Sequence, residues 1–503
     1  MSNLLNPSML TSESREIFET MNNEPVTILQ IGEGNFLRGF VDWMIYICRS
    51  QRLFRGSIAV TQPRPAGKAN IDKLIVQNGI YTLVTQGMDQ GSLVMKKETI
   101  QVFSQMFDPY AEWSRLIELA ISPDLRFIVS NTTEAGLTYR QEELTYGQPI
   151  LSYPGKIAYL LHERYQAFQG NPEKGLILLP CELLERNGDV LKAAVLRYAE
   201  DWHFSASFRD WINKHNRFLN SLVDRIVTGY PDEEQAEAWF EAWGYRDSML
   251  CTAEPYHLWA IEAEEEMEAL LPFRKAGLNV HWTKDLTPFQ QQKVRILNGS
   301  HTWMAPLGLL NGIEHVREFM EHPQFGEWVR NTVLRNILPT LPYDEEELHI
   351  YAKSVFDRFG NPYINHRLAD IAMNSISKFR TRLLPSIAYY IDSDKEIPEG
   401  LVIGVAGLLR YYKVILNDEG VFKGMSLNGS TYVVRDDVKV LESMARHWAS
   451  DEKMTEEVFH QRDIVNAILA DKELWGQDLS AWRNLSETVA EHLECLERGG
   501  INE

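Results

Sequence analysis

The chain has 503 residues, 44% of them hydrophobic, and 70 acidic against 50 basic residues give it a formal net charge of −20. That length exceeds what one hydrophobic core supports, so the sequence predicts two large globular domains. The acidic balance argues against a nucleic-acid partner, and the lack of a long apolar stretch or a signal-like N-terminus argues against a membrane partner and predicts a cytoplasmic protein.

The first predicted element is an apolar strand, Val26–Ile31, which runs directly into a glycine-containing turn. Apolar residues recur at helical spacing over 36–47, and a second strand is predicted at 57–61. Strand, turn, helix and strand within about 35 residues form a βαβ unit, which opens a dinucleotide-binding fold. Gly32 and Gly34 let a pyrophosphate approach the backbone, although an ordinary tight turn has the same pattern.

The end of the second strand normally selects the cofactor, because a carboxylate there accepts hydrogen bonds from the ribose of NAD and repels the extra phosphate of NADP. Here the chain has Gln62 and Arg64, with Lys68 close behind, and no acid, so NADP stays open beside NAD. Strands predicted at 126–130 and 176–179 end in polar loops that a parallel sheet brings to the same edge. The residues expected to contact NAD are Ile31, Gly32, Gly34, Asn35, Phe36, Arg38, Gln62, Arg64, Asn131, Thr132 and Glu134.

From residue 287 onward, amphipathic stretches rich in leucine, glutamate, arginine and tryptophan replace the apolar strands. The predicted fold class is therefore α/β, with an N-terminal Rossmann-like dinucleotide-binding domain over 1–286 and a mainly α-helical substrate domain over 287–503. The last predicted helix runs from Ser486 to Arg498, with Ser486 as its cap and Gly499-Gly500 as its stop.

A lysine, an asparagine and a histidine stand close together near the start of this helical half, as Lys293, Asn298 and His301. On an α-helix Lys293 and His301 lie about 80° apart, and Asn298 about 60° beyond His301. Ketone reduction needs a proton donor, a neutral hydrogen-bond donor for the carbonyl oxygen and a group that orients the substrate. The same three residue types also occur on solvated helix surfaces, and their spacing alone leaves that interpretation open.

Four separated segments resemble the long-chain polyol and mannitol dehydrogenase family. They are GEGNFLRGF at 32–40, VDRI at 223–226, EPYHLW at 254–259 and K-x4-N-x2-H from Lys293 to His301, in the family's order. The resemblance implies an NAD-dependent oxidoreductase that needs no metal. It also implies that Lys293 is the general acid in reduction, that Asn298 donates to the substrate oxygen, and that His301 binds substrate and positions the lysine.

The segments NTTEAG, LPCELLERNG and NPYINHRLADI are similar to the branch of the family that interconverts D-tagaturonate and D-altronate in hexuronate catabolism. The expected partner is therefore a small sugar acid. Fructuronate, mannitol or a mannitol phosphate are alternative substrates within the family, and a catalytically idle dinucleotide-binding protein is the alternative outside it. Basic side chains over 358–382 are the nearest candidates to bind a carboxylate. The expected substrate contacts are Glu182, Arg225 and Lys378, although Arg225 also fits an internal pair with Asp224, and Lys378 a solvated helix face.

Overall fold

The computed structural model describes residues 3–449 and 461–498 and divides the chain into two compact units. Unit 1 consists of residues 1–87 and 93–286, and unit 2 of residues 88–92 and 287–503. Residues 88–92 form the tip of the hairpin made by β4 (Ile80–Asp89) and β5 (Ser92–Gln101). Among the described helices, none combines the length and the apolar character that crossing a bilayer would require.

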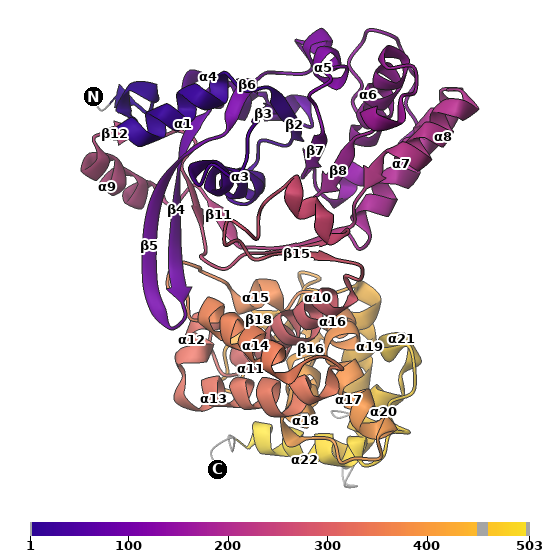
Figure 1. Cartoon of the computed structure of the whole chain (residues 1–503). Helices are drawn as coiled ribbons and strands as arrows, with labels where there is room; N and C mark the ends of the chain where they lie inside the picture. The colour runs from indigo at the N-terminus through magenta and orange to yellow at the C-terminus, as the bar shows by residue number, and fades with distance from the viewer. Residues whose placement is uncertain (1–2, 450–460, 499–503) are drawn as a thin grey trace. The chain divides into compact units, whose positions relative to one another are not determined.

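Unit 1 is built around a six-stranded parallel sheet with the order β6-β3-β2-β7-β8-β9 (Figure 1). Numbered along the chain, this is the strand order 3-2-1-4-5-6 of the dinucleotide-binding fold. All six strands are parallel, and the order in which they are added reverses between β2 and β7. The α/β prediction is confirmed, and the strands predicted at 26–31 and 57–61 have the predicted bounds. The six strands are β2 (Val26–Ile31), β3 (Ser57–Thr61), β6 (Phe103–Met106), β7 (Phe127–Ser130), β8 (Ile177–Pro180) and β9 (Arg217–Phe218).

Successive side chains of a strand point to opposite faces of its sheet. In this sheet both faces are buried, each in its own apolar cluster. Ile28 and Val60 belong to one apolar cluster, whereas Leu29 and Ala59 belong to another. The first cluster includes the apolar face of α3 (Val41–Ser50). The second is formed with the helices α5 (Trp113–Ala120), α6 (Tyr153–Ala167), α7 (Asn187–Asp201) and α8 (Ala206–His215).

The helix predicted over 36–47 is two helices, α2 (Asn35–Arg38) and α3, separated by Gly39 and Phe40. Phe40 has φ −131° and ψ −84°, outside the helical region. A Cβ on Gly39 would stand 2.7 Å from Cγ1 of Val227, so the chain at the break packs directly against β11 (Val227–Gly229). A contact with a residue so distant in sequence leaves no trace in the local apolar spacing.

Two smaller sheets complete the strand content of unit 1 besides the short parallel pair β1–β12 (Asn3–Leu4 with Tyr245–Arg246). One has the order β11-β13-β4-β5, and the other β10-β14-β15. The carboxylate of Glu254 accepts a 2.6 Å hydrogen bond from the amide of Ile226, which ties the EPYHLW segment to the VDRI segment. The remaining elements are α1 (Ser12–Asn22), α4 (Lys68–Val76), α9 (Glu233–Trp243), β10 (Ser221–Asp224), β13 (Cys251–Ala253), β14 (Leu258–Glu262) and β15 (Val280–Thr283).

Unit 2 is mainly helical, as predicted, and its central helix is α11 (Asn298–Leu310) (Figure 1). Every residue of α11 from Gly299 to Gly308 is buried, which marks a helix surrounded on all sides by others. The indole nitrogen of Trp303 donates to the carbonyl of Gly400 at 2.7 Å and joins α11 to α18. The surrounding helices are α10 (Thr287–Gln292), α12 (Val316–Glu321), α13 (Pro323–Asn331), α14 (Glu345–Phe359), α15 (Leu368–Ile371), α16 (Ser375–Arg382), α17 (Leu384–Asp392), α18 (Glu399–Tyr411), α19 (Val438–Ala449), α20 (Gln461–Ala470), α21 (Lys472–Trp475) and α22 (Leu485–Glu497).

Two features of unit 2 differ from the sequence prediction. A small antiparallel sheet, β16 (Val414–Leu416), β17 (Phe422–Met425) and β18 (Thr431–Val433), interrupts the helices. The predicted cap Ser486 lies inside α22, and its hydroxyl donates to the Asn466 side chain at 3.0 Å, because that tertiary contact replaces the local cap. The predicted stop, Gly499-Gly500, lies outside the described residues.

Candidate active site

The turn after β2 exposes backbone at the carboxyl edge of the sheet. Gly32 has φ +137°, and a Cβ there would stand 3.0 Å from the carbonyl oxygen of Asn131, so only glycine fits. Gly34, by contrast, has no atom within 4 Å of its Cβ position. A turn that is closed on the protein side and open on the other fits a pyrophosphate lying against the backbone.

The loops after β7 and β8 are bonded to one another at the same edge. The buried carboxylate of Glu182 accepts hydrogen bonds from the amide of Thr132 at 2.9 Å, the hydroxyl of Thr132 at 3.1 Å and the hydroxyl of Ser130 at 3.2 Å. The side-chain amide of Asn131 donates to the carbonyl of Cys181 at 2.7 Å. Burial raises the pKa of Glu182 against these bonds. Glu182, expected from sequence as a substrate contact, therefore holds the loop that carries Thr132.

Backbone strain marks the next residue of that loop. Thr133 has φ +87°, a conformation that a β-branched residue rarely adopts. Such conformations persist where the surrounding structure enforces them, and they cluster at ligand sites. The strain lies at β7, one of the two strands between which the sheet order reverses, which is where this fold binds its ligands.

The other predicted cofactor residues differ in how far they are exposed at this edge of the sheet. Ile31 is buried at the strand end and Phe36 is half-buried, whereas Asn35, Arg64 and Glu134 are exposed at this edge. Arg38 is different, because its guanidinium is buried and donates to the carbonyls of Glu33 and Met249 and to the Asn35 side chain. Arg38 therefore supports the turn from inside the protein.

Arg225 also lies in the interior of unit 1. Its guanidinium donates to the carbonyl of Gly39 at 2.6 Å, the carbonyl of Glu254 at 2.9 Å and the hydroxyl of Thr85 at 3.3 Å. Its terminal carbon stands 4.0 Å from the ring centroid of Trp43. These contacts join four separate segments, which gives Arg225 a structural role.

In unit 2 the Lys293–Leu297 segment is a π-helix that continues directly into α11. The α-helical angles expected between Lys293 and the other two residues therefore do not apply, whereas Asn298 and His301 both lie in α11 and keep the expected spacing. A π-helical turn is uncommon and recurs at functional sites. Lys293 and Asn298 are half-buried, whereas His301 is 9% exposed.

The imidazole of His301 is enclosed by other rings. Its centroid lies 4.6 Å from that of Phe359 and 4.7 Å from that of His366. Its Nε2 atom is buried and has no hydrogen-bond partner among the described residues. Burial lowers the pKa of His301 well below 6.5, and the nearby basic groups of His366, Arg358, Arg382 and Lys378 lower it further. The ring is therefore neutral at pH 7 and presents an unused polar atom.

Two of the cations near His301 come from α16. Arg382 donates through Nη1 to the hydroxyl of Thr302 at 3.1 Å and the carbonyl of Asn298 at 3.5 Å. Lys378 donates through Nζ to the carbonyl of Ile371 at 2.9 Å. Burial lowers the pKa of both cations, and their hydrogen bonds within the described chain go to neutral groups. These half-buried positive charges lie beside a neutral imidazole.

Comparison with known proteins extends over both units. A family model described as the mannitol dehydrogenase Rossmann domain matches residues 26–274, and one described as the mannitol dehydrogenase C-terminal domain matches residues 285–497. The chain belongs to the mannitol dehydrogenase family.

Members of this family include named relatives of nearly the same length. The chain is 40% identical to the altronate oxidoreductase of Halalkalibacterium halodurans over 95% of this chain and 92% of the relative. It is 39% identical to the altronate oxidoreductase of Bacillus subtilis over 97% of this chain and 96% of the relative. The identity to the altronate oxidoreductase of Escherichia coli O7:K1 is 36%, over 95% and 96%.

Two solved structures share the fold of this chain over nearly its whole length. Pseudomonas fluorescens mannitol 2-dehydrogenase, in a ternary complex with NAD and D-mannitol, is 23% identical and covers 96% of this chain and 94% of its own, with a TM-score of 0.64. A substrate-free D-sorbitol dehydrogenase is 19% identical and covers 99% and 97%, with a TM-score of 0.75. At these identities the likeness concerns the fold.

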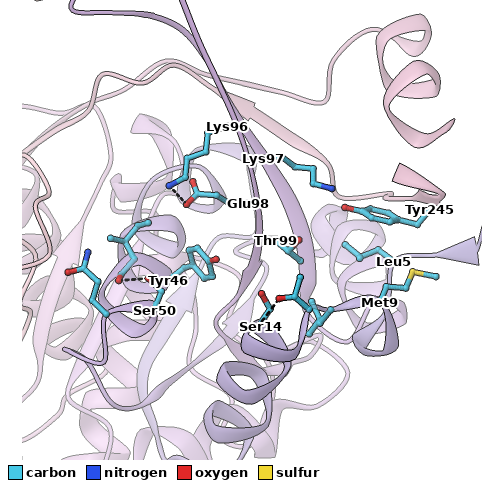
Figure 2. Close-up of a pocket in the computed structure, with 14 residues that line it drawn as sticks. Leu5, Met9, Ser14, Tyr46, Ser50, Lys96, Lys97, Glu98, Thr99 and Tyr245 are labelled. Carbon is cyan, nitrogen blue, oxygen red and sulfur yellow. Dashed lines mark hydrogen bonds and ion pairs between the residues drawn. The ribbon is translucent and has the colours of Figure 1, made fainter. Parts of the chain in front are cut away.

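A pocket of about 560 Å³ lies in unit 1. Its lining includes Leu5, Tyr46, Lys97 and Tyr245, and Figure 2 shows Lys96 paired with Glu98 at its wall. None of the residues predicted to bind cofactor or substrate lines it. This pocket therefore adds no residue to the candidate sites of unit 1 or of unit 2.

Three basic residues beside His301 were not singled out from sequence, although all fall in the basic stretch 358–382. Arg358, His366 and Arg382 come from separate elements and converge only in the folded unit. The resemblance segment NPYINHRLADI contains His366, and no family motif marks Arg382. The signal available was the density of basic residues, which does not identify the ones that face α11.

Proposed function

We propose that the protein is an NAD-dependent oxidoreductase that interconverts D-tagaturonate plus NADH with D-altronate plus NAD⁺. Membership of the mannitol dehydrogenase family and the full-length similarity to altronate oxidoreductases support this reaction. The observation that favours a sugar acid over a neutral polyol is the group of cations around His301. A cytoplasmic location agrees with the four cysteines, none of which forms a disulfide.

A half-buried positive charge is unfavourable unless an anion or a polar network compensates for its lost hydration. Arg382 donates to a carbonyl and a hydroxyl, which leaves most of its charge uncompensated, whereas the charge of Lys378 is partly offset by Asp436. A sugar-acid carboxylate supplies the missing charge, and an arginine fork suits its two oxygens. Mannitol supplies none. In a chain with a net charge of −20, such a local site also concentrates the anion against the overall field.

Each residue of the K-x4-N-x2-H motif then has a distinct role. NAD(H), when bound, supplies or accepts the hydride. Lys293 donates a proton from Nζ to the ketone oxygen in reduction and accepts it in oxidation. The Asn298 side chain donates a hydrogen bond to that oxygen. Neutral His301 uses its unpartnered Nε2 atom to bind and orient a substrate hydroxyl.

Residues of unit 1 hold the dinucleotide. Gly32 and Gly34 form the open turn, and Asn131 and Thr132 are fixed by the loop bonds at the switch point. Gln62 is buried and follows directly after β3. The open turn and the fixed loops at this edge of the sheet are therefore compatible with a bound NAD.

A panel of ketones tests the substrate class. We expect NADH oxidation with tagaturonate to exceed that with fructose by about a hundredfold or more in kcat/KM, because a site built for a charged group discriminates strongly against a substrate that lacks it. Fructuronate and fructose 6-phosphate belong in the same assay, since each carries an anion.

Each other outcome of the panel has a definite meaning. Preference for fructuronate or fructose 6-phosphate would assign the alternative family substrates. Equal turnover of fructose would contradict the sugar-acid proposal. Tight NADH binding without turnover of any ketone would identify an idle dinucleotide-binding protein.

The pH dependence of kcat/KM tests the neutral imidazole. Because the folded-state pKa of His301 is lowered well below 6.5, the ring stays neutral as the pH falls from 8 to 6.5. We therefore expect no loss of kcat/KM from this group in that range. The free energy of unfolding should decrease as the pH falls below 6.5, because the unfolded chain then binds a proton that the folded chain does not. An ionisation near pH 6.5 that disappears in His301→Asn would contradict the assignment.

A further inference from the structure

The carboxylate that normally follows the second strand of this fold is missing from the sequence after β3. In its place stands Gln62, whose side chain is buried. The adenosine ribose of a bound dinucleotide lies beyond the end of this strand. The chain therefore needs another acceptor there, or it binds the ribose without one.

An acid reaches this position from the neighbouring strand β6. β6 pairs with β3 in parallel register, with Met106 opposite Val60, so Asp108 emerges beside Gln62. The side-chain amide of Gln62 donates to Oδ1 of Asp108 at 2.7 Å. The amide of Tyr110 donates to the same oxygen at 2.9 Å. Within the described chain, Oδ2 of Asp108 accepts no hydrogen bond, which leaves a fixed carboxylate with one oxygen available.

A buried lysine, Lys156, holds the segments that carry Gln62 and Asp108 together. Lys156 is 1% exposed, and its Nζ donates to the carbonyl of Pro63 at 2.8 Å and to the hydroxyl of Tyr110 at 2.6 Å. The hydroxyl of Tyr110 in turn donates to the carbonyl of Pro63 at 2.7 Å. These bonds join the segment after β3 to the segment after β6, so Asp108 and Gln62 keep their relative position without a ligand.

The basic residues nearby do not form a ready phosphate site. Lys68 donates to both carboxylate oxygens of Asp72 at 2.7 Å, so its charge is already paired. Arg64 is exposed. A phosphate on the ribose 2′ oxygen would meet an exposed arginine, a lysine already paired with Asp72, and the fixed negative charge of Asp108.

We propose that Asp108 replaces the missing strand-end carboxylate, accepts hydrogen bonds from the adenosine ribose hydroxyls and excludes the 2′-phosphate of NADP. Gln62 acts as a positioning residue, because its amide orients the carboxylate. The inference rests on the proposed function for dinucleotide binding and adds the residue that determines NAD specificity. It assigns that role to the third strand of the sheet rather than the second.

Direct binding measurements on the full-length protein, without a sugar substrate, test this assignment. NADH and NADPH are titrated separately by energy transfer from protein tryptophan to the reduced nicotinamide. In Asp108→Asn, which keeps the size of the side chain and an acceptor for Gln62, NADH affinity should fall about tenfold, since a charge-assisted hydrogen bond is lost. NADPH affinity should rise, so that the ratio of the two dissociation constants shifts about a hundredfold.

Glu112→Gln is the matched control. It removes one negative charge four residues away, where the carboxylate pairs with Arg115 at 3.2 Å, and it should leave the ratio unchanged. Asp108→Ser is a second variant, so that a folding defect in one substitution does not decide the result. An unchanged NADH to NADPH ratio in a folded Asp108 variant would overturn the assignment, as would an equal shift in Glu112→Gln. Failure of the unmodified protein to bind either dinucleotide would instead overturn the proposed function.

Discussion

Replacing Lys293 by alanine should lower kcat for tagaturonate reduction by about a thousandfold, while the dissociation constant of NADH stays within a factor of about two, because a positioned general acid contributes two to four orders of magnitude. The two effects separate because Lys293 belongs to unit 2, whereas the residues that fit the dinucleotide belong to unit 1. Steady-state kinetics with tagaturonate and a fluorescence titration with NADH measure the two quantities independently.

Chemical rescue distinguishes proton transfer from a structural effect of the same substitution. A small primary amine added to Lys293→Ala should restore part of the turnover, since it supplies the missing ammonium group. Lys439→Ala removes an exposed lysine from α19 of the same unit and should leave kcat unchanged. Turnover of Lys293→Ala at the level of the unmodified protein would remove the proposed chemistry.

The strands that carry the dinucleotide turn could be predicted to the residue. β2 and β3 are short apolar runs bounded by polar or glycine residues, and both of their faces are buried, so local sequence determines them. The break between α2 and α3 could not, because it depends on the packing of Gly39 against Val227. The local spacing of apolar residues indicates which side chains are buried, but it does not indicate which distant residue they pack against.

In the candidate site, too, some features could be predicted from local sequence and others could not. Lys293, Asn298 and His301 lie within nine positions of one another and are found by motif, whereas the π-helical turn that begins at Lys293 and precedes α11 has no comparable sequence signature. Asp108 was missed because its position depends on the register of β6 against β3. The carboxylate expected after β3 is supplied instead by Asp108, which follows the neighbouring strand β6. This substitution can be recognised only from the order of the strands in the sheet.

Arg382→Met should raise KM for tagaturonate by about a hundredfold with a smaller change in kcat, because a hydrogen bond between a guanidinium and a carboxylate contributes about 1.5–3 kcal/mol. Arg382→Lys keeps the charge without the fork and should recover part of the loss. The inhibition constant of gluconate, a sugar acid without a ketone, should rise in parallel with KM. These values follow from initial rates over a range of substrate and inhibitor concentrations.

The same guanidinium also joins α16 to α11, so its structural contribution has to be measured separately. Thr302→Val removes the hydroxyl that accepts the 3.1 Å hydrogen bond from Arg382 and leaves the positive charge in place. If the main role of Arg382 is to bind the substrate carboxylate, Thr302→Val changes KM by a few-fold at most, well short of the effect of Arg382→Met. If the two variants raise KM equally, the cation acts through helix packing. The charge around His301 would then no longer favour a sugar acid over a polyol.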